Sequence, residues 1–145
     1  MKTLDEVRTY LNDIPFISCG GCGISSLSIY RWLKKHNKHS KVTLVFLYKD
    51  WRNEQYINNQ NILRNISTGE PGAPSHACLY IKKKFVDEYC DNIDTSEYKY
   101  IQNFTEEQFL VRTNNNIGSW NPSFDRDNIR DIEKALKIDL SDILT

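Results

Sequence analysis

Cysteine and histidine are the residue types in this sequence best suited to nucleophilic chemistry. Cys22 stands in a glycine-rich turn, Cys19-Gly20-Gly21-Cys22-Gly23, directly before an apolar pattern with helical spacing. A helix N-terminus favours the thiolate, because its dipole and its backbone N–H groups stabilise negative charge. The flanking glycines permit a tight backbone that can direct N–H groups towards a developing oxyanion. The turn therefore predicts a reactive thiol at Cys22.

A thiol nucleophile needs a base, and that base must come from elsewhere in the chain. His76 opens a predicted strand directly after the Gly/Pro-rich stretch 69–74, a usual place for a side chain at the rim of a cleft. His36 and His39 instead lie in a basic stretch at a predicted helix end, where they are expected to face solvent. His76 is therefore the predicted base.

The geometry of a predicted hairpin selects an acid to orient His76. The strands 76–81 and 84–89 flank Lys82 and Lys83. If these two lysines form a two-residue turn, Asp87 lies on the same face as His76 and diagonally across from it, within reach of a ring nitrogen. A three-residue turn would reverse the alternation and bring Glu88 to His76 instead. Asp87 is the predicted third member, with Glu88 and Asp91 as the alternatives.

The remaining elements are predicted from their periodicity and composition. The region 51–66 is predicted as a loosely amphipathic helix. Helices are expected at 3–12, 22–35, 104–111 and 124–136, and strands at 42–48, 76–81, 84–89 and 98–101. With 145 residues and no evident linker, the chain is expected to form a single domain, 1–145, of the α+β class.

The order of a cysteine opening a helix, a histidine opening a strand and a carboxylate on the next strand resembles the papain-like superfamily of cysteine peptidases. The resemblance is closest to its small members, the NlpC/P60, transglutaminase-like and C39-like hydrolases. The stretches 19–27, 76–81 and 85–87 carry it, within residues 15–90. The resemblance implies a Cys–His–Asp triad, with the cysteine helix packed on a small antiparallel sheet.

One feature of papain-type enzymes has no counterpart here. Those enzymes carry a glutamine a few residues before the cysteine as an oxyanion donor, and the matching stretch 14–18 has none. The backbone N–H of Cys22 is the first candidate donor in its place. Ser18 or Cys19 is the candidate for the second.

The spacing of Cys19 and Cys22 also allows a different class of protein, a binding module held together by zinc. Two thiolates on one tight turn are typical of a zinc knuckle, and His76 with Cys78 or Cys90 would complete four ligands. A redox Cys-x-x-Cys pair and a papain-like scaffold without activity are further alternatives. Without a zinc knuckle, Cys78 and Cys90 are expected to be small apolar side chains, and no metal or cofactor is needed.

Charge and hydropathy limit the classes of binding partner and the cellular location that the sequence predicts. Nineteen Lys and Arg residues balance nineteen Asp and Glu residues, so no net field favours binding to nucleic acid or to anionic lipid. The longest apolar run, 44–48, is too short to cross a bilayer, and no secretory signal is recognised. A cytoplasmic protein is expected. The sequence predicts a peptidase, amidase, deamidase or acyltransferase acting on a protein or peptide, which would suit a host- or phage-encoded modifier.

Overall fold

The computed structural model describes residues 2–15, 17, 21–36, 41–48, 76–98, 100–109 and 126–143. The elements in chain order are α1 (Leu4–Asn12), α2 (Cys22–Lys35), β1 (Val42–Tyr48), β2 (His76–Ile81), β3 (Lys84–Val86), β4 (Tyr100–Phe104), α6 (Arg126–Leu136) and the 3-10 turn η1 (Ser141–Ile143). The fold class is mixed α and β, which confirms that part of the sequence prediction. The helix expected at 51–66 lies outside the described residues.

The four strands form one antiparallel sheet in the order β3-β2-β1-β4. The strand predicted at 98–101 is displaced: it is β4, which begins at Tyr100 and pairs with β1. Pairing with β1 places β4 at the opposite edge of the sheet from β3. The hydrophobic pattern of a short strand specifies neither its neighbour in the sheet nor its exact ends.

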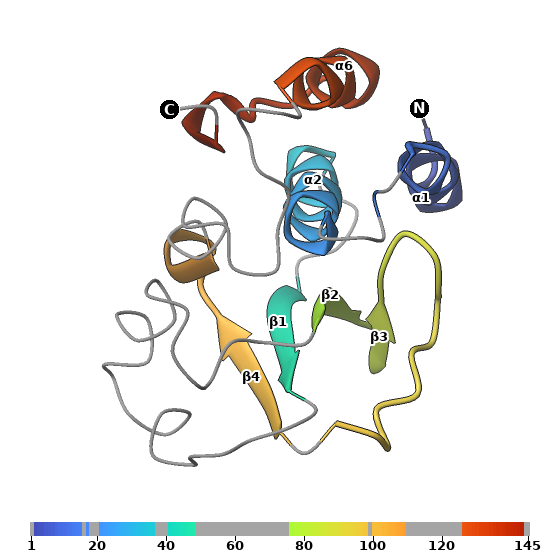
Figure 1. The fold of residues 1–145 in the computed structure, drawn as a ribbon, viewed down its shortest axis with the longest axis vertical. Coiled ribbons are helices and arrows are strands. Elements are labelled where there is room, and N and C mark those ends of the chain that lie inside the picture. Colours follow the sequence, from blue (N-terminus) through green and yellow to red (C-terminus); the bar gives the residue numbers. More distant parts are fainter. Residues whose placement is uncertain are drawn as a thin grey trace.

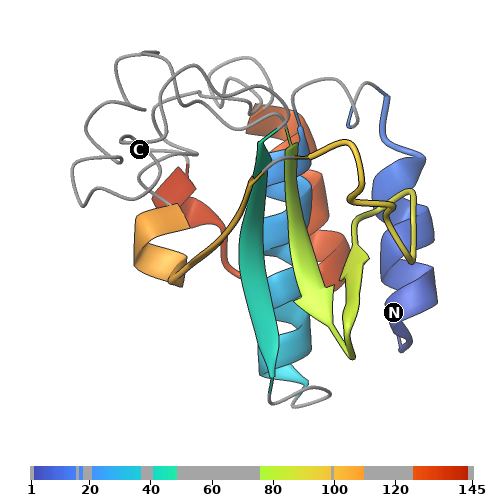
Figure 2. The same ribbon diagram turned by 90° about the horizontal axis from the view of Figure 1, so that it is seen from below.

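Helix α2 is enclosed between the sheet and the other helices. Figure 1 shows α2 lying over the strands, with α6 beyond it and α1 at its side. In Figure 2, α2 and β2 run in the same direction and begin at the same end of the molecule. This end therefore holds both Cys22, the first residue of α2, and His76, the first residue of β2.

The two faces of the sheet carry two separate hydrophobic clusters. The larger cluster joins the helices to the sheet face that includes Leu44, Phe46 and Leu79. The smaller cluster lies on the opposite face around Val45, Leu47 and Cys78. Alternation of side chains along β1 and β2 produces this division, as a strand period of two requires.

The β2–β3 hairpin has the two-residue turn that the sequence analysis required. Ile81 pairs with Lys84, and the backbone angle φ is positive at both turn residues, 51° at Lys82 and 66° at Lys83. Positive φ at both central positions is typical of a type I′ turn, whose twist matches that of the strands. The predicted register of this hairpin is therefore confirmed.

Replacing Lys82 and Lys83 with the Asn-Gly pair should raise the free energy of unfolding by about 1–2 kcal/mol, because lysine is strained at positive φ, which asparagine and glycine adopt more readily. Urea unfolding of the double variant measures the change. The control is Lys134→Gly in the exposed part of α6, where the same kind of change lowers the free energy of unfolding by about 1 kcal/mol. A loss of stability in the turn variant would contradict the assigned turn.

One arginine of α2 connects three distant segments. Arg31 Nε donates to Glu106 Oε1 at 2.7 Å, and its Nη atoms donate to both carboxylate oxygens of Asp142 at 2.7 and 2.8 Å. A further bond of 2.7 Å joins Nη1 to the backbone carbonyl of Asp139. This bidentate, charge-assisted arrangement fixes η1 and the helical turn 106–109 to α2.

No helix within the described ranges has the length and apolar character needed to cross a membrane.

Candidate functional site

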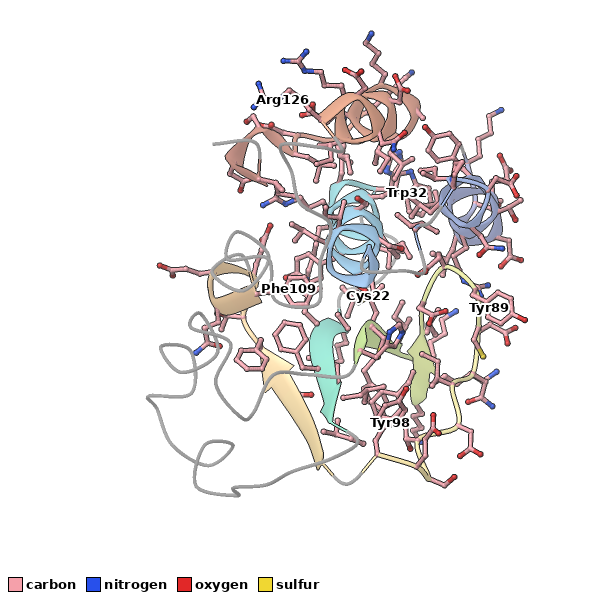
Figure 3. The ribbon with its side chains drawn as sticks, in the orientation of Figure 1. Cys22, Trp32, Tyr89, Tyr98, Phe109 and Arg126 are labelled. Carbon is pink, nitrogen blue, oxygen red and sulfur yellow. The ribbon has the colours of Figure 1, made fainter. Side chains whose placement is uncertain are left out.

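Cys22 is the first residue of α2, where the sequence places the start of the helix. Gly21 is the N-cap residue and makes no side-chain hydrogen bond to the first turn, which also contains no acidic residue. The positive end of the helix dipole at Cys22 is therefore not neutralised by a side chain of its own turn. Figure 3 shows Cys22 on the part of α2 that faces the strands, and the residue is 7% exposed.

His76 and Asp87 are hydrogen-bonded to each other. The distance from His76 Nε2 to Asp87 Oδ2 is 2.8 Å, and both side chains are largely buried. The two-residue turn is the reason for this contact, because its register places Asp87 on the face of the hairpin that carries His76. Asp87 is thus the carboxylate that the structure brings to His76.

A tight turn holds the Asp87 carboxylate in place. Asp87 Oδ1 accepts hydrogen bonds from the backbone N–H groups of Tyr89 at 2.8 Å and Cys90 at 2.6 Å, and the Asp87 N–H donates to the Cys90 carbonyl at 2.9 Å. The strand predicted to continue to residue 89 therefore ends at Val86, because Asp87 starts a turn of its own. One oxygen of the Asp87 carboxylate therefore binds the turn, and the other binds His76.

The pKa of His76 depends on Cys22 as well as on Asp87. Burial alone lowers the pKa of His76, but hydrogen bonds to Asp87 and Cys22, with the negative charges of both groups, raise this pKa to about 10. Burial also acts against the ionised form of Asp87, yet the hydrogen bonds from His76 and from the Cys90 and Tyr89 N–H groups lower its pKa. The arrangement stabilises the imidazolium form of His76, which lies between the Asp87 carboxylate and the Cys22 side chain.

Glu88, the alternative orienting acid, does not contact His76 in this way. Its carboxylate accepts a hydrogen bond of 2.9 Å from the Ser25 hydroxyl, and the residue is 4% exposed. Burial raises the pKa of Glu88, and the nearby charge of Asp87 raises it further. The choice of Asp87 over Glu88 follows from the hairpin register.

The other cysteines divide by their surroundings. Cys78 is completely buried in the smaller cluster, and burial raises the pKa of its thiol, with further contributions from the charges of Asp87, Cys22 and Glu88. Cys90 is partly buried and takes part in the Asp87 turn through its backbone. The expectation that Cys78 is a buried apolar side chain is confirmed, whereas Cys90 is only partly covered.

One proposed zinc ligand and both candidates for the second oxyanion donor fall on residues 18 and 19. Cys19 and Ser18 lie outside the described residues. Among the residues that are described, His, Cys, Asp and Glu side chains form no group of three or more arranged for a metal ion. The zinc alternative that depends on Cys19 stays a prediction.

Sequence reasoning missed two side chains near the site. Ser25 appeared only as a small residue of α2, and nothing local indicated its contact with Glu88, 63 residues later. Tyr98 packs against the smaller cluster; burial raises the pKa of its phenol, with smaller effects from the charges of Glu97, Cys78, Asp87 and Cys22. Such contacts depend on the path of the chain between distant segments, which single-sequence patterns do not encode.

Comparison of the chain with protein-family models, with curated proteins and with solved structures gave no match.

The site also predicts how stability changes with pH. Because the His76 pKa is raised from 6.5 to about 10, its contribution to stability is complete below pH 6.5 and is lost as pH rises towards 10. Asp87 has a lowered pKa, so its contribution is present above 3.8 and is lost in acid. Urea unfolding at a series of pH values should show a decline on the alkaline side that is smaller in a His76→Gln variant. Parallel declines in the two proteins would contradict the prediction.

Proposed function

We propose that this chain is a cysteine-dependent hydrolase or acyltransferase of papain-like type. Cys22 is its nucleophile, His76 its base and Asp87 the residue that orients His76. The observation that carries the proposal is the position of His76, which is hydrogen-bonded to Asp87 at 2.8 Å and to the Cys22 side chain. A nucleophile, a base and an orienting acid in this order form the general arrangement for covalent catalysis.

The proposed reaction proceeds on the carbonyl group of an amide, in a protein or peptide. His76 holds the Cys22 proton as an imidazolium, and the Cys22 thiolate attacks the carbonyl carbon. Protonated His76 then gives the proton to the leaving amine, which leaves a thioester on Cys22. Water or an amine attacks the thioester while neutral His76 accepts its proton, and departure of the Cys22 thiolate restores the starting pair of thiolate and imidazolium. Peptidase, amidase, deamidase and acyl-transfer reactions all follow this course.

The start of α2 is the proposed place for the oxyanion. Cys22 is the first residue of the helix, so its backbone N–H belongs to the set of four that an α-helix leaves without an intrahelical partner. A tetrahedral intermediate on the Cys22 sulfur places its oxygen near these N–H groups. Ser18 and Cys19 remain the proposed sources of the second donor.

Alkylation of the wild-type protein tests the proposal directly. At about pH 6, an unactivated thiol with a pKa near 8.5 is almost entirely protonated. Iodoacetamide should therefore modify Cys22 at least about tenfold faster than it modifies a small-molecule thiol. Peptide mapping by mass spectrometry identifies the modified residue, and Cys90 is an internal reference because it is free and partly exposed.

Two results would contradict the proposal. One is a Cys22 rate equal to that of the small-molecule thiol. The other is stoichiometric zinc in the purified protein that is lost on replacement of Cys19 or Cys22, which would assign the turn to a structural metal site.

A further inference from the structure

A buried carboxyl group lies beside the proposed triad without contacting the reacting atoms. Glu88 follows Asp87 directly in the chain, and its carboxylate accepts the hydrogen bond from Ser25 Oγ. Both residues are buried, Ser25 completely and Glu88 to all but 4%. Removing a carboxyl group from water is unfavourable even when it is hydrogen-bonded, and an apolar side chain would fill this place more stably. The position of this group therefore calls for a role other than stability.

Ser25 belongs to the helical turn that carries the nucleophile. It lies three residues after Cys22, so the two side chains are neighbours on the helix surface. Its backbone N–H donates to the Gly21 carbonyl at 2.9 Å, which closes the first turn around Cys22. A bond to the Ser25 side chain consequently fixes the orientation of that turn and not only of Ser25.

Asp87 and Glu88 thus contact the segments that carry both the proposed base and the proposed nucleophile. Asp87 binds His76 through its side chain, and its backbone carbonyl accepts a 2.7 Å hydrogen bond from Arg8 Nε of α1. Glu88 binds the first turn of α2. Three segments that are distant in the sequence meet at two adjacent residues.

We infer that Glu88 is a positioning residue, which holds the first turn of α2 through Ser25 and so sets the place of Cys22 relative to His76. The inference rests on the proposed function. The charged groups that act on Glu88 are Asp87 and His76, beside the Ser25 hydroxyl. Asp87 makes the hydrogen bond to the His76 ring, so the contact by which Glu88 positions Cys22 is its hydrogen bond to Ser25 on α2.

Four variants test the inference with two measurements. The variants are Glu88→Gln, Glu88→Ala, Ser25→Ala and, as a matched control, Ser28→Ala, which removes another buried hydroxyl of α2 whose bond runs within the helix to the Ile24 carbonyl at 2.7 Å. The measurements are the pH profile of Cys22 alkylation and the hydrogen exchange of the Ser25 amide. If Glu88→Ala does not fold, Ser25→Ala, which is the milder change, is sufficient for the test.

We expect Ser25→Ala and Glu88→Ala to slow Cys22 alkylation at about pH 6 by about tenfold, as a small misplacement of a reacting group does. Exchange of the residue 25 amide should become faster in the same two variants. Glu88→Gln keeps an oxygen that accepts from Ser25, so its alkylation rate should stay within about threefold of wild type. Ser28→Ala should leave the alkylation profile unchanged whatever it does to stability.

The inference is overturned if Ser25→Ala and Glu88→Ala alkylate with the wild-type profile, even where amide exchange has become faster. It is also overturned if Ser28→Ala slows alkylation as much as Ser25→Ala does, since a purely structural effect of a lost buried bond would then explain both. The proposed function is judged on the wild-type rate alone, so its failure is distinct from a failure that appears only between variants.

Discussion

Replacing His76 with alanine should slow the alkylation of Cys22 at about pH 6 by about two orders of magnitude, because a neighbouring protonated imidazole lowers the pKa of a thiol. The imidazole is the group through which Asp87 and Cys22 are connected, and its raised pKa, about 10, keeps it protonated near the thiolate at that pH. Without this positive charge, the thiolate loses its main stabilising partner. The change is measured by following modification of the Cys22 peptide at several pH values.

His36→Ala is the matched control for this variant. His36 is exposed at the end of α2, where its Nδ1 lies 3.0 Å from the Trp32 carbonyl and its ring stacks on Trp32. The control should react like the wild type. Equal rates in His76→Ala and wild type would show that the imidazole does not act on Cys22, and the proposed triad would then be wrong.

Replacement of Asp87 should affect stability and reactivity together. Asp87→Ala removes the acceptor of His76 and of the Tyr89 and Cys90 N–H groups. It leaves a buried, charged imidazole and two backbone donors without this partner, so the free energy of unfolding should fall by roughly 2–4 kcal/mol. Cys22 alkylation at about pH 6 should slow at the same time, because His76 loses the group that orients it.

Asp87→Asn separates these two effects. An amide oxygen can still accept from the turn N–H groups, whereas the neutral amide no longer stabilises an imidazolium at His76. Compared with Asp87→Ala, this variant should therefore regain much of the free energy of unfolding but little of the Cys22 alkylation rate. Asp91→Ala, an exposed carboxylate in the same loop, is the control and should change neither quantity. Full recovery of both by Asp87→Asn would assign Asp87 a role in the turn only.

The sequence was informative where short-range rules determine the geometry. Cys22 at a helix start, His76 at a strand start and the hairpin around Lys82 and Lys83 all follow from local pattern, and a two-residue turn then determines which carboxylate meets His76. The usual Asn-Gly signal of such a turn is absent, so the alternation of the flanking strands carried that prediction.

The same reasoning could not predict contacts between segments that are distant in the sequence. The position of β4 next to β1 depends on the route of the chain, not on the composition of the strand. The early end of β3 depends on the Asp87 side chain, which accepts hydrogen bonds from the Tyr89 and Cys90 N–H groups. The Ser25–Glu88 bond depends on both the helix position and that turn. The papain-like resemblance stays a proposal on the same grounds, because the observed sheet and helices establish only a mixed α and β fold.

The enclosure of α2 has a consequence for the order of events during synthesis on the ribosome. This helix carries Cys22, and Arg31 on the same helix binds Glu106, Asp139 and Asp142, which are synthesised much later. The apolar side chains of α6, Ile129, Ile132 and Leu136, likewise join the main cluster late in the chain. A nascent chain that ends before residue 126 therefore has α2 without its outer cover and Arg31 without its Asp142 partner. Helix α2 reaches its final surroundings only after translation of the segment that packs over it.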